Sequence, residues 1–174
     1  LAADGATRWV CPPEMSAPTL AALLAAAPAA IETELLVWGR LPLALSARCF
    51  TARHFDLQKD RCEYRCLGAA DGLPLATREG VPFLTLNGIE TQSAAVYNLV
   101  AELPALAATG VDVVRVSPQG SGTFEVVATL KEALAGTVDA RTAAERLRPR
   151  LPGPPCNGFW HGRFGADWVA ALGP

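Results

Sequence analysis

The fold class is decided by the ten residues from Val111 to Gly120, which read VDVVRVSPQG. The first six form a short apolar run that is typical of a buried strand, and Pro118 and Gly120 mark a turn after it. Residues that favour a helix follow from Thr123 to Leu134. Because short apolar strands that alternate with helices are characteristic of parallel sheets, this unit predicts an α/β protein.

The same alternation recurs on both sides of this unit. Strands are predicted at residues 6–10, 31–39 and 81–88, and helices at residues 16–27, 92–107 and 141–148. Residues 40–80 carry little periodicity and are expected to form a long insertion, and residues 137–174 are expected to form a C-terminal tail.

The number of strand–helix units and the pattern of residues 1–5 together predict half of a barrel. Residues 1–5 resemble the last turn of a helix closed by a glycine, as if a preceding segment were absent. About four strand–helix units are half of the eight in a (β/α)8 barrel. We therefore expect residues 1–174 to be a single domain, the C-terminal half of a (β/α)8 TIM-like barrel with a cysteine-bearing insertion at residues 40–80.

The composition excludes several classes of protein. With 51% hydrophobic residues, 18% charged residues and a net charge of −2, the chain lies far from the composition of disordered proteins. A pI near 5.7 does not indicate the strongly basic surface that binding to nucleic acid usually requires. The longest apolar stretch, from Leu20 to Ile31, is interrupted by Pro28 and is shorter than the roughly twenty residues of a membrane-spanning helix. We expect a packed protein with no membrane span.

Three of the five cysteines, Cys49, Cys62 and Cys66, fall within 18 residues with the spacing C-x12-C-x3-C. An odd number of cysteines and the absence of a secretory signal argue against a disulfide framework. Three clustered thiols suit an incomplete four-cysteine site for zinc or for an iron–sulfur cluster. The missing ligand could be Cys11, Cys156 or a cysteine outside this chain.

Positive charge surrounds these three cysteines. Five Arg or Lys side chains and three carboxylates lie in the same segment, and they are Arg48, Arg53, Lys59, Arg61, Arg65, Asp56, Asp60 and Glu63. An excess of positive charge favours thiolates and the anionic sites that they build. The charge pattern therefore supports metal or cluster binding without separating zinc from iron.

Several stretches of this sequence resemble the U32 peptidase-like family, in the branch that serves oxygen-independent ubiquinone biosynthesis. They are GRLPLALSARCFTAR (residues 39–53), LNGIET (86–91), VYNL (96–99), VDVVRVSPQG (111–120) and CNGFW (156–160). The resemblance implies a [4Fe-4S] cluster held by four cysteines, with Cys49, Cys62 and Cys66 at three of the ligand positions. Its fourth ligand is expected outside this chain, whereas Cys156 does not match a ligand position.

The resemblance also implies an activity and partners. The chain would be the [4Fe-4S]-binding subunit of an oxygen-independent hydroxylase in ubiquinone (coenzyme Q) biosynthesis, located in the cytoplasm. It would form a heterodimer with a UbiU-like homologue and would work with a lipid-binding partner. Two alternatives are an RNA-modifying hydroxylase of the same family and a zinc-stabilised interaction module without enzymatic activity.

The candidate catalytic residues are Glu34, Arg115 and Asn87, because each lies in or at the end of a predicted strand. A guanidinium in an apolar strand needs an anion or a carboxylate, so Arg115 is expected to contact either an anionic substrate or Glu34. Of the two histidines, His54 is either a ligand or exposed, and His161 is expected to be structural. No serine-hydrolase elbow, zinc-peptidase motif or P-loop occurs, so the sequence does not support peptidase activity.

Overall fold

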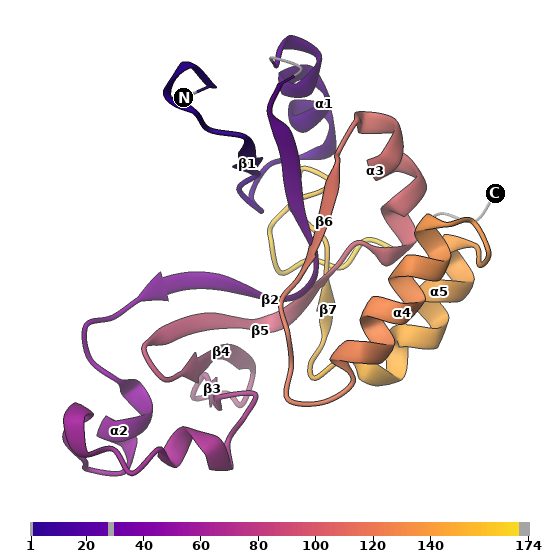
Figure 1. The fold of residues 1–174 in the computed structure, drawn as a ribbon. Helices are drawn as coiled ribbons and strands as arrows, with labels where there is room; N and C mark the ends of the chain where they lie inside the picture. Colours follow the sequence, from indigo (N-terminus) through magenta and orange to yellow (C-terminus); the bar gives the residue numbers. More distant parts are fainter. Residues whose placement is uncertain (1, 28–29, 171–174) are drawn as a thin grey trace.

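The structure is a computed structural model that describes residues 2–27 and 30–170 (Figure 1). Part of the N-terminal turn predicted at residues 1–5, and the end of the tail beyond residue 170, lie outside the described residues. Among the described residues, no helix combines the length and the apolar character that crossing a membrane requires.

The strands form one sheet of mixed direction. They are β1 (Arg8–Val10), β2 (Glu32–Leu45), β3 (Leu73–Ala76), β4 (Pro82–Asn87), β5 (Glu90–Asn98), β6 (Val113–Val116) and β7 (Pro155–Cys156). The order along the sheet is β1-β2-β5-β4-β3, with β6 also paired to β2 and β7 to β5. β1 and β6 run parallel to β2, whereas β5, β4 and β3 are joined by antiparallel pairs.

The prediction of half of a (β/α)8 barrel is therefore wrong. The described strands form an open seven-stranded sheet of mixed direction, whereas that barrel is built from parallel strands. The main cause is the stretch at residues 92–107, where apolar spacing predicted a helix and where β5 occupies residues 90–98 instead. Because β5 pairs with β2 on one side and β4 on the other, sheet hydrogen bonds override the local helical pattern.

The helices fall into separate groups around the sheet. They are η1 (Ala2–Asp4), α1 (Ala17–Ala26), α2 (Phe50–His54), η2 (Lys59–Arg61), η3 (Arg65–Gly68), η4 (Val100–Glu102), α3 (Leu103–Thr109), α4 (Thr123–Leu134), α5 (Ala140–Leu147) and η5 (Arg148–Arg150), where η marks a 3-10 helix. Figure 1 shows α3, α4 and α5 beside the parallel strands, and α2 at the far end of an arm made by β2, β3, β4 and β5. The predicted insertion thus contains the end of β2, three short helices and β3.

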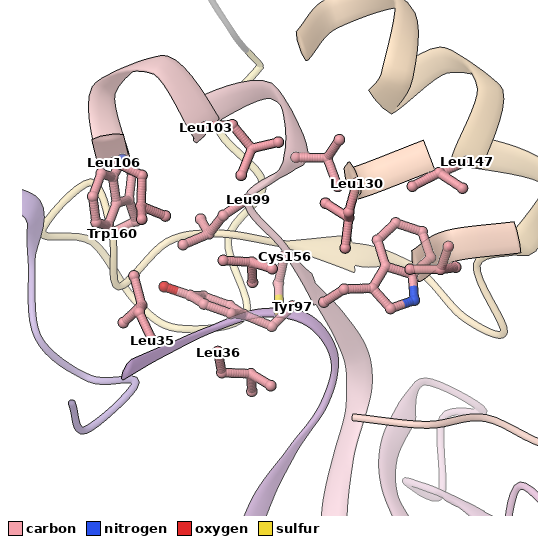
Figure 2. Packing of buried hydrophobic residues seen from close by; sticks show 14 of the residues in the cluster. Leu35, Leu36, Tyr97, Leu99, Leu103, Leu106, Leu130, Leu147, Cys156 and Trp160 are labelled. Carbon is pink, nitrogen blue, oxygen red and sulfur yellow. The ribbon is translucent and has the colours of Figure 1, made fainter. Parts of the chain in front are cut away.

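The core fills the space between the sheet and these helices. Trp38 of β2 and Tyr97 of β5 are its largest fully buried side chains, and helices contribute Leu106, Leu130 and Leu147 (Figure 2). Burying apolar side chains of this size contributes about 1.5–3 kcal/mol each. The buried part of β2 is therefore the centre of the hydrophobic core.

Gly39 allows β2 to pass very close to the segment after β6. A side-chain Cβ at this position would lie 2.5 Å from Cβ of Ser117, which is too short a distance for two carbon atoms that are not bonded to each other. Gly39 also has φ 119°, a backbone region that favours glycine. From this point on, β2 leaves β6 and pairs with β5 alone.

Arg40 stabilises the part of β2 where the strand changes its pairing from β6 to β5. Arg40 as a whole is only 7% exposed. Its guanidinium donates hydrogen bonds to the carbonyl oxygens of Ser93, Ala94 and Pro152, with distances of 2.9 Å to Ser93 and 3.2 Å to Pro152. Burial lowers the pKa of this guanidinium. One cation thus joins β2 to β5 and to the loop before β7, which sequence reasoning did not anticipate.

Replacing Arg40 with Met should destabilise the protein by about 2–4 kcal/mol, because the carbonyl groups lose charged donors at a site closed to water. Urea unfolding measures this change. Arg146→Met is the control, since Arg146 makes an exposed ion pair with Glu132 and should cost under about 0.5 kcal/mol. Equal losses in the two variants would show that the buried hydrogen bonds of Arg40 add nothing.

Candidate functional site

The three clustered cysteines lie in one small unit, residues 46–72, which we call the cysteine lobe. Cys49 precedes the first residue of α2, Cys62 follows η2, and Cys66 lies within η3. All three thiols are free and half-buried. The structure therefore places the predicted cluster ligands in the same lobe, each at or in a short helix.

The turn between β4 and β5 positions Cys49. The backbone nitrogen of Phe50 donates to the carbonyl oxygen of Gly88 at 2.7 Å, and the nitrogen of Gly88 donates to Oγ1 of Thr51 at 3.2 Å. Sγ of Cys49 accepts a hydrogen bond from the nitrogen of Ala52 at 3.4 Å. Because this turn belongs to the sheet, the start of α2 has a fixed position relative to the arm.

A basic cavity of about 520 Å³ opens beside Cys49. Arg48, Arg53 and Lys59 line it together with Asp56, so cations outnumber the carboxylate. The ammonium group of Lys59 donates to the carbonyl oxygen of Ala47 at 3.2 Å, which holds it at this cavity. The cavity therefore provides a positively charged environment for a thiolate and for an anionic group bound to it.

The backbone between Cys62 and Cys66 is in a strained conformation. Glu63 and Tyr64 have φ values of 52° and 51°, in the left-handed region that non-glycine residues rarely adopt. Arg65 makes two contacts in this segment. Its Nη2 lies 2.8 Å from Oε2 of Glu63, and its Cζ lies 5.8 Å from the ring centre of Phe55. The contact with Phe55, the residue after α2, brings η3 next to the end of that helix.

The donor chemistry of the lobe fits an iron–sulfur cluster, whereas its described geometry is not that of a closed metal site. Thiolates are the ligands of such clusters, and the lobe supplies three of the usual four. Within residues 2–27 and 30–170, however, no three His, Cys, Asp or Glu side chains form a group that could hold a metal ion. A cluster on this lobe would thus require the thiols to converge further and a fourth ligand to be added.

Cys11 and Cys156 are core residues rather than members of the lobe. Burial raises the pKa of each thiol to about 11, so both are neutral near pH 7. Cys11 Sγ lies 3.4 Å from the carbonyl oxygen of Pro12, and Cys156 lies near Tyr97 in the core (Figure 2). Neither thiol contributes to the lobe as described.

Glu34 and Arg115 form an ion pair on the parallel strands. Nε of Arg115 lies 3.6 Å from Oε1 of Glu34, and Nη1 of Arg8 lies 3.2 Å from Oε2 of the same carboxylate. Arg8 also pairs with Glu32 at 2.9 Å. The carboxylate predicted as one possible partner of Arg115 is therefore its observed partner.

Asn87 lies apart from this ion pair, at the end of β4, in the turn whose Gly88 is hydrogen-bonded to Phe50 and Thr51 of α2. His54 is exposed at the end of α2, with its ring edge-to-face on Phe55 at 4.9 Å. His161 contacts Glu102 at 3.1 Å and Asn157 at 3.3 Å, as expected for a structural residue. The three candidate catalytic residues are thus not brought into one site.

Asp71, at the end of the cysteine lobe, was not predicted as a site residue. Its carboxylate accepts a hydrogen bond from the backbone nitrogen of Gly120, in the loop between β6 and α4. A Cβ on Gly120 would lie 2.9 Å from Cβ of Ala70, so only glycine fits this approach. The contact joins the lobe to the end of a parallel strand, and no sequence signal beyond the turn residues indicates it.

No family model matches the chain, and no solved structure gives a significant match to it. The functional assignment therefore depends on the residues of the site.

Thiol labelling tests the two classes of cysteine. In cluster-free protein at pH 8, Cys49, Cys62 and Cys66 should react with iodoacetamide, whereas Cys11 and Cys156 should react only after unfolding, because they are buried and uncharged. Peptide mass spectrometry after timed labelling measures each site. Rapid labelling of Cys156 in the folded protein would contradict this division.

Replacing Glu34 with Gln should lower the free energy of unfolding by about 1–3 kcal/mol, because Arg115 and Arg8 lose a carboxylate whose side chain is only 14% exposed. Glu32→Gln is the matched control, since that side chain is 54% exposed and its pair should contribute under about 1 kcal/mol. Urea unfolding at low salt measures both. A larger loss for Glu32→Gln would refute the structural importance of Glu34.

Proposed function

We propose that this chain is an iron–sulfur subunit of an oxygen-independent hydroxylase that acts on ubiquinone precursors, similar to UbiV of the U32 peptidase-like family. The observation that carries the proposal is the cysteine lobe, where Cys49 opens onto a basic cavity and Cys62 and Cys66 lie in the same unit. The sequence resemblance at residues 39–53 supports the assignment to this family.

The charge of the lobe suits an anionic cofactor. A cluster held by thiolates carries negative charge, which Arg48, Arg53 and Lys59 offset around Cys49. When bound, the cluster would supply one-electron redox chemistry. The chain's own contribution is to hold three thiols on short helices and to fix Cys49 through the turn at Gly88.

The fourth ligand and the partners are proposed to come from outside this chain. Tyr64 and Leu67, which flank Cys66 in sequence, are large apolar residues exposed to solvent. Exposed apolar groups of this size support the proposal that another polypeptide segment covers the lobe. A UbiU-like homologue and a lipid-binding protein are the partners proposed from the resemblance.

A zinc-stabilised interaction module is the second candidate, because the same three thiols suit structural zinc. The basic cavity does not distinguish the zinc module from the iron–sulfur subunit, because a zinc ion bound by four thiolates is also an anionic site. Iron and sulfide content does separate them.

Anoxic purification with the polypeptide that supplies the fourth ligand should give about four iron and four sulfide ions per chain. Cys49→Ala, Cys62→Ala and Cys66→Ala should each lose this content, because each removes a ligand. Metal analysis, sulfide analysis and the visible absorption spectrum measure the outcome.

Cys11→Ala and Cys156→Ala are the matched controls, because both thiols are buried outside the lobe. Each should retain iron and sulfide once folding has been verified by circular dichroism. Zinc without sulfide would favour the interaction module, and equal loss from Cys156→Ala would reject the ligand assignment.

A further inference from the structure

A second cavity, separate from the basic cavity at Cys49, lies against the antiparallel arm. It has a volume of about 600 Å³, is open to solvent on one side, and is lined by residues of β2, residues 81–84, β5 and the segment from Pro154 to Ala166. Its walls come from parts of the chain that are far apart in sequence, so the cavity exists only in the folded protein.

The described side chains that line this cavity carry neither a charge nor a free hydroxyl. Among the described residues that line it, none is Asp, Glu, Lys, Arg or His, and only Ser93 carries a hydroxyl. That hydroxyl is already used, because it donates to the carbonyl oxygen of Ala95 at 2.5 Å and accepts from the nitrogen of Leu41 at 2.9 Å. The thiol of Cys156 is neutral because burial raises its pKa to about 11. The cavity therefore suits an uncharged apolar group.

Aromatic side chains shape the wall and the rim. A Cβ on Gly165 would lie 2.3 Å from Cζ of Phe159, so the absence of a side chain at Gly165 lets that ring form part of the wall. Phe83 and Phe164, also in the lining, are largely exposed to solvent. Large apolar groups at a cavity rim are typical of a binding site rather than of an ordinary surface.

The size of the cavity suits a small molecule. Its volume lies within the roughly 300–1,000 Å³ of small-molecule sites.

We infer that this cavity binds an uncharged aliphatic chain of a lipid-like small molecule. The inference goes beyond the proposed function, because it concerns a cavity that none of the three lobe cysteines lines and it holds with or without a cluster. A branched isoprenoid chain and a straight alkyl chain share the required chemistry, so the experiment includes both.

The test is a titration of the purified chain with N-phenyl-1-naphthylamine, an uncharged probe that fluoresces in apolar surroundings. We expect one saturable site from which farnesol, 1-dodecanol or both displace the probe. Displacement by farnesol alone would assign an isoprenoid chain, displacement by dodecanol alone a straight chain, and displacement by both an aliphatic chain of either kind.

Phe164→Asp should weaken probe binding about tenfold or more, because it places a charge at the rim in a side chain that is 75% exposed and not needed for the core. Phe83→Asp on β4 tests the rim from a second element. Phe124→Asp on α4 is the matched control, since Phe124 is 92% exposed and lies outside the cavity. Its affinity should stay within a factor of two, a margin set by the roughly 0.5 kcal/mol spread of neutral surface substitutions.

Two results would overturn the inference. One is equal probe binding by the Phe164→Asp and Phe124→Asp proteins, both shown to be folded by circular dichroism. The other is a wild-type dimer, seen by sedimentation, that excludes the probe and becomes monomeric in Phe164→Asp. The second result would assign the cavity to a contact between copies of this chain.

Discussion

The close passage of β2 beside the end of β6 is the constraint on which the rest of the structure depends. At Gly39 the two segments approach so closely that a side chain on β2 would overlap Ser117. Before this point β2 has parallel neighbours and lies in the core, and after it β2 pairs with β5 and leads into the arm. The buried guanidinium of Arg40 then holds the arm to the body through backbone carbonyl groups. One strand thus carries both the hydrophobic core and the support of the cysteine lobe.

The cysteine lobe depends on this arm for its position rather than on a core of its own. Phe50 and Thr51 are hydrogen-bonded to the turn at Gly88, and Asp71 is hydrogen-bonded to Gly120 in the loop between β6 and α4. The lobe is therefore attached both to the antiparallel arm and to the parallel part of the sheet. Such attachment would suit the proposed function, in which another polypeptide segment covers the lobe and its thiols.

The sequence predicted local elements more successfully than their assembly. The helix expected from Thr123 to Leu134 has those bounds in the structure, because its turn residues and its apolar spacing are both local signals. The helix expected at residues 92–107 is a strand up to Asn98, because its two neighbours in the sheet supply hydrogen bonds that local spacing cannot reveal. The barrel prediction is wrong for the same reason, since it assumed that every strand of the sheet would be parallel.

The sequence by itself determined which residues are candidates for chemistry, namely three thiols in a basic segment and an arginine in an apolar strand that required an anion or a carboxylate. These follow from residue type and spacing, which are properties of the chain before it folds. Only the tertiary structure decided that Glu34 pairs with Arg115, that the turn containing Asn87 is hydrogen-bonded to the start of α2, and that an uncharged cavity lies along the arm. Those arrangements join segments far apart in sequence, and their contacts arise only when β2 pairs with different strands along its two halves.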